Sequence, residues 1–225
     1  MNPEAEMSKA DKLIKLLYII IAILITLNII DLIVGQPSWQ ITRLINIDIE
    51  SNVPTWFSSI ILAIAAFLSY KCSLAVGEER YKKRTWQLLS LGFLAMSCDE
   101  VAMIHEHLGA TINKYFTGLK GLNSTWIVIL GPFVLILVFI FIIMMKKSLI
   151  GSKKASRILL FGVGMYIVGA FFLEATVNVL NKGNLTVLLP AEHIIEELFE
   201  MSGAVIIIKG LLEHYKFLTK TKVNP

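Results

Sequence analysis

Acidic and histidine side chains interrupt three segments of this chain that are otherwise apolar. In chain order they are Asp99, Glu100, His105, Glu106, His107, Glu174, His193, Glu196, Glu197 and Glu200, called the acidic cluster below. A charged side chain at the centre of a bilayer costs about 2.5–3.5 kcal/mol on insertion scales, so such residues face a bundle interior, a wet cavity or a partner. We therefore expect the function to reside in the acidic cluster.

The last of these segments carries its polar residues on one side of a helix. His193 and Glu197 are four residues apart, as are Glu196 and Glu200, so the four side chains share one helical face. Carboxylates that share a face repel each other unless they are protonated or bridged by a cation. The spacing favours a bound cation.

The segment 86–108 cannot aim all of its polar residues at one point while it remains a straight helix. Asp99 and Glu106 share a face, whereas His105 points about 120° away from Asp99 at the usual helical turn per residue. A π-bulge or an early helix end would bring them together. The choice between His105 and His107 as the inward-facing histidine stays open.

Carboxylates and imidazoles together are typical ligands of zinc, manganese and iron. The acidic cluster therefore predicts a divalent metal ion (Zn, Mn or Fe). Its candidate ligands are Glu100, His105, Glu106, His107, Glu174, His193, Glu196 and Glu197. Asp99 and Glu200 are the candidate catalytic residues, because either can act as a general base toward a water molecule. The zincin motif His-Glu-x-x-His is absent from the chain.

A proton or cation pathway is the second interpretation of the acidic cluster, because intramembrane Asp, Glu and His residues also serve transporters. The half of the bundle beyond the cluster contains no ionisable residue in 87–97 or 201–208, which argues against a continuous pathway. A purely structural network of polar residues is the third interpretation. The sequence leaves all three open.

The composition is that of an integral membrane protein. Hydrophobic residues make up 56% of the 225 residues, charged residues only 17%, and the mean hydropathy is +0.70. We predict an all-α fold, with residues 1–225 forming a single transmembrane domain. Its six helices are expected at 13–34, 55–77, 86–108, 126–145, 158–180 and 188–212, each near or above the ~20 residues that a span needs. The two cysteines form no CxxC pair.

The basic residues are placed very unevenly. All but four of the 21 Lys and Arg residues fall near the termini and in two of the expected loops. The four on the other side are Arg43, Lys114, Lys120 and Lys182. By the positive-inside rule, both termini are expected in the cytoplasm. His214, in the basic C-terminal region, is expected to be solvated.

The segment before the second expected helix alternates apolar and polar residues. Pro54 predicts a helix start, because proline favours the first helical turn. Asp48 and Glu50 are expected either to cover the acidic cluster from outside or to form a solvated acidic loop. The sequence does not decide between these two arrangements.

The chain resembles a family of uncharacterised bacterial multipass membrane proteins. The resemblance is carried by the segment 50–59, by the DE-x4-HE motif from Asp99 to Glu106 and by the EE-x2-E motif from Glu196 to Glu200. It covers about residues 40–212 and implies the topology and the importance of these acids. The chain is also loosely similar to membrane hydrolases of the ceramidase and adiponectin-receptor type. Those proteins have seven helices and a His-x-x-x-His pair, and this sequence has neither.

These observations together predict a multipass protein of a bacterial cytoplasmic (inner) membrane. Its first expected function is that of a metal-dependent hydrolase-like enzyme acting on a lipid or another amphiphile. In that hypothesis Glu100, Glu106, His193 and Glu197 bind the ion and Glu174 orients a ligand. The alternative is a proton- or cation-translocating transporter or sensor. Expected partners are membrane lipids and a small-molecule or lipid substrate, with a homo-oligomer possible and nucleic acid excluded.

Overall fold

The computed structural model describes residues 3–115 and 125–223, and within these ranges every regular element is helical. The elements are α1 (Pro3–Ile33), α2 (Trp39–Ile45), α3 (Val53–Ala75), α4 (Arg80–Ala102), α5 (Ile104–Tyr115), α6 (Thr125–Ile129), α7 (Gly131–Ser148), α8 (Lys153–Ile167), η2 (Val168–Leu173), α9 (Glu174–Lys182), η3 (Thr186–Leu188) and α10 (Leu189–Val223). Lys120, one of the four basic residues expected on the outer side, lies outside the described residues.

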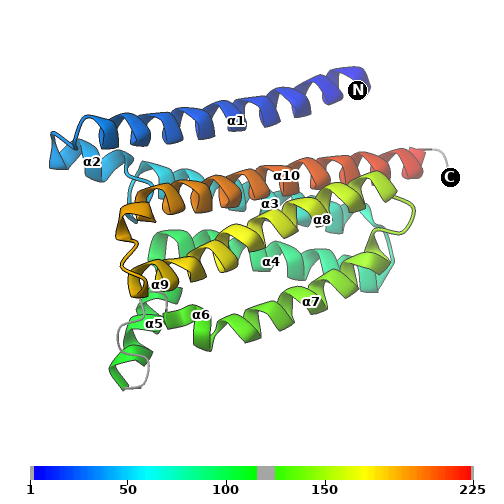
Figure 1. Ribbon diagram of the computed structural model, residues 1–225. Coiled ribbons are helices and arrows are strands. Elements are labelled where there is room, and N and C mark those ends of the chain that lie inside the picture. Colours follow the sequence, from blue (N-terminus) through cyan, green and yellow to red (C-terminus); the bar gives the residue numbers. More distant parts are fainter. Residues whose placement is uncertain (1–2, 116–124, 224–225) are drawn as a thin grey trace.

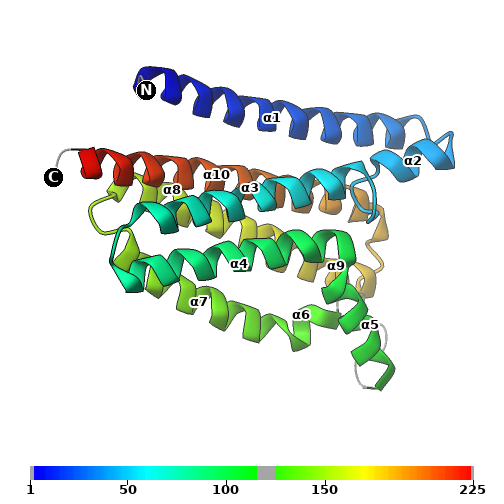
Figure 2. The ribbon, with the colours of Figure 1, turned by 180° about the vertical axis from the view of Figure 1, so that it is seen from behind.

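The long helices run side by side along one axis (Figures 1 and 2). Both termini lie at one end of this bundle, and α2, α5 and α6 lie at the other. Four stretches are long and apolar enough to cross a membrane, namely Lys9–Ile33, Val53–Ala75, Gly131–Ser148 and Lys153–Lys182. The bent pair of α4 and α5 adds a fifth if it is counted as one span. The fold is thus the all-helical fold that the sequence predicts, and its apolar helices fit a membrane protein.

The long helix α10 lies inside the bundle, where it packs against α1, α3, α8 and η2. Its middle turns bury Val205, Ile208 and Leu211 against Ala65 and Cys72 of α3. Along α10, Val205, Ile208 and Leu211 follow the residues of the acidic cluster toward the end of the bundle that holds the termini. The half of the bundle that contains the termini is therefore closed by a packed apolar core.

Two glycines allow α8 and α10 to approach each other closely. A Cβ atom on Gly203 would lie 2.6 Å from the backbone nitrogen of Tyr166, and one on Gly162 would lie 2.8 Å from that of Ile207. Small residues permit this approach in packed membrane helices. The contact holds Tyr166 directly beside α10.

We expect Gly203→Ala to lower the free energy of unfolding by about 1–3 kcal/mol, because the added methyl group overpacks a backbone contact. Gly164→Ala is the matched control, since a Cβ there meets nothing within 4 Å. Thermal unfolding of the detergent-purified variants, followed by circular dichroism, measures the difference. Equal melting temperatures for the two variants would contradict this role of Gly203.

The predicted third helix, 86–108, is interrupted. The helix α4 ends at Ala102, and Met103 adopts a left-handed conformation with φ 52° and ψ 39°. The next helix, α5, is bent by 66° from α4. A residue in the left-handed region cannot continue a right-handed helix. The prediction of one continuous helix is therefore wrong, and the early helix end considered from the sequence is observed.

The fourth and fifth predicted helices also differ from the structure. The segment 126–145 is divided into α6 and α7, with Leu130 between them. The segment 158–180 contains the π-helical turn η2 between α8 and α9. A π-helical turn changes the direction of the side chains that follow it, which here begin with Glu174. The π-bulge considered for the third helix is thus found in the fifth.

The prediction of a solvated His214 is wrong. Its side chain is fully buried and stacks on the ring of Trp86, with the two ring centroids 4.8 Å apart. The reason is that α10 continues to Val223, well beyond its predicted end at residue 212. The later turns of α10 therefore still pack inside the bundle.

The predicted start of α3 is confirmed. The helix begins at Val53 with Pro54 in its first turn, and the side chain of Asn52 accepts a hydrogen bond from the backbone N–H of Thr55 at 3.2 Å. Such an N-cap satisfies one of the free amide groups at a helix start. The cap also fixes the point at which the loop before α3 joins the helix.

Candidate functional site

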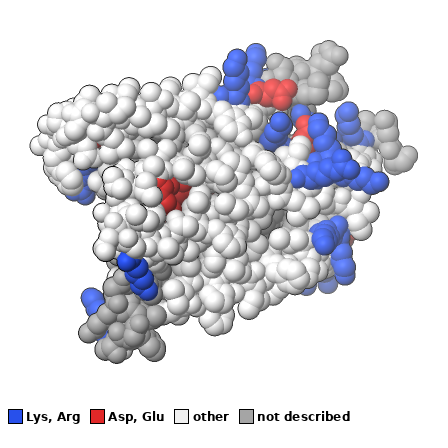
Figure 3. Space-filling view, viewed as in Figure 1, with Lys and Arg blue, Asp and Glu red and all other residues white. Residues whose placement is uncertain are grey.

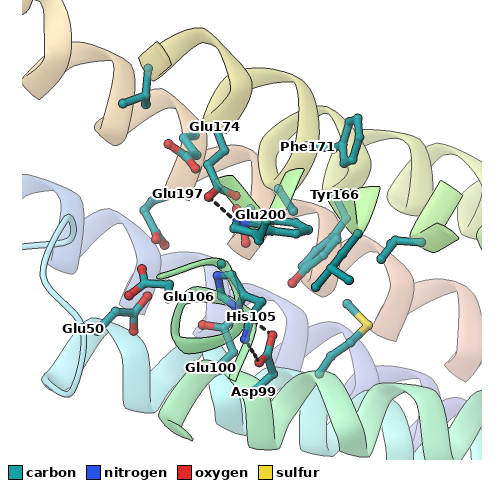
Figure 4. A pocket seen from close by; sticks show the side chains of 18 of the residues that line it. Glu50, Asp99, Glu100, His105, Glu106, Tyr166, Phe171, Glu174, Glu197 and Glu200 are labelled. Atoms are coloured by element: carbon teal, nitrogen blue, oxygen red, sulfur yellow. Dashed lines mark hydrogen bonds and ion pairs between the residues drawn. The ribbon is translucent and has the colours of Figure 1, made fainter. Parts of the chain in front are cut away.

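A cavity of about 860 Å³ lies among α4–α10 and the loop before α3. We call it the acidic cavity. Its acidic and histidine lining residues are Asp48, Glu50, Asp99, Glu100, His105, Glu106, Glu174, His193, Glu196, Glu197 and Glu200. Figure 4 shows Glu197 and Glu200 approaching from one side and Glu50, Glu100 and Glu106 from the other. Nearly all of the acidic cluster predicted from the sequence is thus brought to one space.

His107 is the member of the acidic cluster that does not line the cavity. Its ring nitrogen Nδ1 lies 2.6 Å from the carbonyl oxygen of Met103, and its side chain is exposed. The bend between α4 and α5 turns His105 inward instead. The structure therefore selects His105 from the two histidines that the sequence left open.

Asp99 and His105 form a closely bonded pair across the helix break. One carboxylate oxygen of Asp99, Oδ1, accepts the backbone N–H of His105 at 2.9 Å. The other, Oδ2, lies 2.7 Å from Nδ1 of the His105 ring. Asp99 therefore both caps the first turn of α5 and orients the imidazole. Since Nδ1 faces Asp99, Nε2 is the nitrogen left to exchange a proton with a ligand.

Glu174 is connected to the same pair through Trp126. The indole Nε1–H of Trp126 donates a hydrogen bond to Glu174 Oε1 at 2.7 Å. The ring of Trp126 meets the His105 ring edge-on, with centroids 4.9 Å apart. The side chains of α4, α5, α6 and α9 are thus held together around one wall of the cavity.

The loop before α3 lines the cavity with Asp48 and Glu50, and its Asp48 side chain also remains half-exposed, so the loop combines features of both expected arrangements. Asp48 Oδ1 lies 3.2 Å from His193 Nε2, and Glu50 lines the cavity. The loop is held by Asn46, which accepts a hydrogen bond from the backbone N–H of Asp48 at 2.8 Å. Burial raises the pKa of the Glu50 carboxyl above its ordinary value, because water no longer stabilises its charged form.

Glu192, His193 and Glu196 form the group best arranged to hold a metal ion in the part of the chain that the structure describes. One ligand atom from each lies within 4.8 Å of the others. His193 Nδ1 is 3.4 Å from Glu192 Oε2 and 3.5 Å from Glu196 Oε2. We call these three residues the ion group.

The environment of the ion group fits a cation. Glu192 and Glu196 are each 8% exposed, and Glu192 Oε2 receives no hydrogen bond from any residue that the structure describes. The other oxygen of Glu192 accepts a hydrogen bond from Thr176 Oγ1 at 3.0 Å. A buried carboxylate oxygen without a donor costs free energy unless a cation or a proton meets it.

The charge of the acidic cavity is strongly one-sided. Its described lining residues include nine Asp or Glu, two His and no Lys or Arg. Such a set of carboxylates is stabilised by protons or by bound cations. The cavity is therefore suited to a positively charged ligand.

Glu192 of the ion group and Tyr166 of the cavity lining are residues that the sequence analysis did not single out. Glu192 directly precedes His193 on the same apolar helix, and that pairing of a carboxylate with an imidazole was a readable signal. Tyr166 lies two turns before Glu174 and lines the cavity beside Glu200 (Figure 4). Nothing in the sequence context of Tyr166 distinguishes it from an ordinary core aromatic.

The fold and the cavity define the class of protein, an all-helical chain whose long apolar helices, of the membrane type, surround an acidic cavity. Within that class, the chain belongs to the family described as a domain of unknown function (DUF8692), whose family model matches residues 16–214. The match covers all of the residues that line the cavity. No curated protein and no solved structure matches the chain.

Proposed function

We propose that this protein is a membrane-embedded, metal-dependent enzyme of the hydrolase type that acts on an amphiphile. The observation that carries the proposal is the ion group, a set of two buried carboxylates and one imidazole, of which His193 and Glu196 line the acidic cavity. Zinc, manganese and iron all accept such ligands. A divalent ion held by Glu192, His193 and Glu196 would supply Lewis-acid chemistry, activating water and polarising a substrate oxygen.

Asp48 supports the assignment of His193 as a ligand. A histidine that binds a metal through one ring nitrogen usually donates its other N–H to a carboxylate, which fixes the ring. Here Nδ1 of His193 faces Glu192 and Glu196, and Nε2 faces Asp48 at 3.2 Å. The ring is therefore already oriented to present Nδ1 to the ion group.

His105 is the residue that we assign as general base, with Asp99 as its positioning residue. In hydrolysis, His105 Nε2 accepts a proton from the attacking water and returns it to the leaving group. Asp99 holds the ring and stabilises its protonated form, as the 2.7 Å contact allows. Glu200, the second catalytic candidate from the sequence, also lines the cavity and is the second candidate base. The closed apolar core below the cavity keeps the reaction on one side of the bundle.

We further propose that the chain crosses a bacterial cytoplasmic membrane six times, with α10 as the sixth span over residues 188–212 and both termini inside. The termini share one end of the bundle, and Lys and Arg gather at that end (Figure 3). The face seen between the two ends is uncharged apart from an acidic patch. This distribution agrees with the positive-inside rule.

The test is the ion content of protein purified in detergent from cells supplied with Zn, Mn and Fe. We expect about one divalent ion per chain by elemental analysis, as one closed ligand set predicts. Hydrolysis of a panel of membrane lipids should cease after chelation and return when the ion is restored. Absence of a stoichiometric ion under all three supplements would overturn the proposal.

A transporter for cations is the second candidate, and the order of acids along α10 favours it. Glu192, Glu196 and Glu200 follow each other at one-turn intervals into the bundle, as in a relay. Ion flux into liposomes that contain the protein, driven by a proton or metal gradient and unaccompanied by lipid hydrolysis, would select this function.

A further inference from the structure

The acidic cavity has an apolar part that the ion group and the general base do not use. On one side it is lined by Leu130, directly before α7, and by Val134, Leu135 and Val138 within α7. On the other side it is lined by Ile167, Ala170 and Phe171. We call this part the apolar slot. From Leu130 to Val138 it extends along α7 for about 12 Å at the helical rise per residue.

The packing of α7 explains why the slot exists. The buried residues of α7 are Gly131 and Ser148, which lie at its two ends. At the first end, a Cβ on Gly131 would overlap the ring of Phe171, so α7 and η2 are in direct contact there. Between its ends, the inward side of α7 borders the cavity instead of packing into the core. The slot is thus bounded by an apolar helix that belongs to a candidate span.

The two parts of the cavity call for different chemistry. A space lined only by aliphatic and aromatic side chains stays dry and takes apolar groups. The nine acids in the other part, with no Lys or Arg among the described lining residues, favour a cation. Figure 4 shows Phe171 and Tyr166 on the side away from Glu50 and Glu106, so the apolar and acidic parts adjoin.

We propose that the acidic cavity binds a single-chain amphiphile with a cationic amine head group. The amine donates hydrogen bonds to carboxylates of the acidic cavity, and the hydrocarbon chain lies in the apolar slot along α7. A cavity of this volume is in the range that encloses one small ligand, roughly 300–1,000 Å³. The inference rests on the proposed function in naming this amphiphile as the substrate class.

The test uses dodecylamine that carries a photoreactive diazirine at the end of its chain, with the diazirine derivative of dodecanoic acid as the anionic comparison. Each probe is irradiated with the wild-type protein in lipid nanodiscs, and labelled peptides are mapped by mass spectrometry. We expect the amine probe to label α7 and η2, and the acid probe to label these segments about tenfold less, as one buried charge interaction predicts. Equal labelling by the two probes would overturn the inference.

Two variants on α7 locate the chain. Val138→Trp fills the slot and is expected to reduce labelling by the amine probe about tenfold, because overpacking excludes the chain. Phe139→Trp is the matched control, since Phe139 is 63% exposed and faces away from the cavity, and its labelling should equal that of the wild type. Unchanged labelling of Val138→Trp by the amine probe would overturn the inference. If Val138→Trp does not fold, the comparison of the two probes on the wild-type protein still tests the inference.

The ion content of the same wild-type samples separates the two proposals. Selective labelling by the amine in a protein without bound metal would support the amphiphile site and overturn the metal-dependent enzyme. A protein that holds its ion but shows no labelling of the apolar slot would support the metal-dependent enzyme and overturn the amphiphile site.

Discussion

Replacing His193 with alanine is expected to weaken divalent-ion binding at least about a hundredfold, since even the partners of metal ligands contribute ten- to a hundredfold. The substitution removes the only nitrogen ligand of the ion group, so that only the carboxylates of Glu192 and Glu196 remain to bind the ion. Calorimetric titration of the metal-stripped protein in nanodiscs with Zn and Mn measures the affinity directly.

The matched control for this prediction is His107→Ala. Both histidines belong to the acidic cluster in the sequence, but His107 is exposed and faces the Met103 carbonyl outside the cavity. Its removal should leave the affinity unchanged. Asp48→Asn should give an intermediate loss of about ten- to a hundredfold, because it removes the carboxylate that orients the ring. Wild-type affinity in His193→Ala, with an unchanged melting temperature, would show that the ion does not bind at the ion group.

Trp86→Ala is expected to give the largest loss of stability, about 3–5 kcal/mol, because it opens a cavity in a close-packed core. Trp86 is fully buried and stacks on His214, whose ring also lies near Phe217 with centroids 6.1 Å apart. The control is Trp56→Ala, since Trp56 is 64% exposed. Chemical denaturation of both variants in the same detergent, followed by tryptophan fluorescence and circular dichroism, compares their free energies of unfolding.

A substitution of His214, the stacking partner of Trp86, separates the effect of packing from that of hydrogen bonding in this part of the core. Neither ring nitrogen of His214 has a hydrogen-bond partner among the described residues. Replacing a buried polar group that lacks a partner with an apolar group of similar shape is nearly neutral or stabilising. His214→Phe should therefore be at least as stable as the wild type, and strong destabilisation would show that His214 has a polar role that the packing does not reveal.

The spacing of residues was sufficient to predict an all-helical fold and most of the residues that gather around the cavity. Apolar segments of about 20 residues predict membrane-type helices because their length is set by the bilayer, a rule that depends on composition alone. The acids and histidines inside those segments could be named as candidate site residues for the same reason, since a charge in an apolar segment needs a special environment. Nine of those ten residues line the acidic cavity.

Other features depended on contacts that no single segment contains. The left-handed residue Met103 ends α4, and Asp99 then caps α5, which turns His105 inward and His107 outward. Glu192 becomes part of the ion group because Thr176, on another helix, fixes its second oxygen. His214 is buried because Trp86 of a different helix meets it. Periodicity along one helix cannot predict such pairings, since they depend on how the helices are placed against each other.

The sequence by itself therefore determined which residue types lie in which apolar helix, because hydrophobicity and spacing are local properties. The tertiary structure alone decided which of them share a cavity, which carboxylates lie close enough to hold one cation, and that an apolar slot along α7 adjoins them. The physical reason is that burial and distance between segments arise only when the helices pack. A helix break of one residue was enough to choose between two neighbouring histidines.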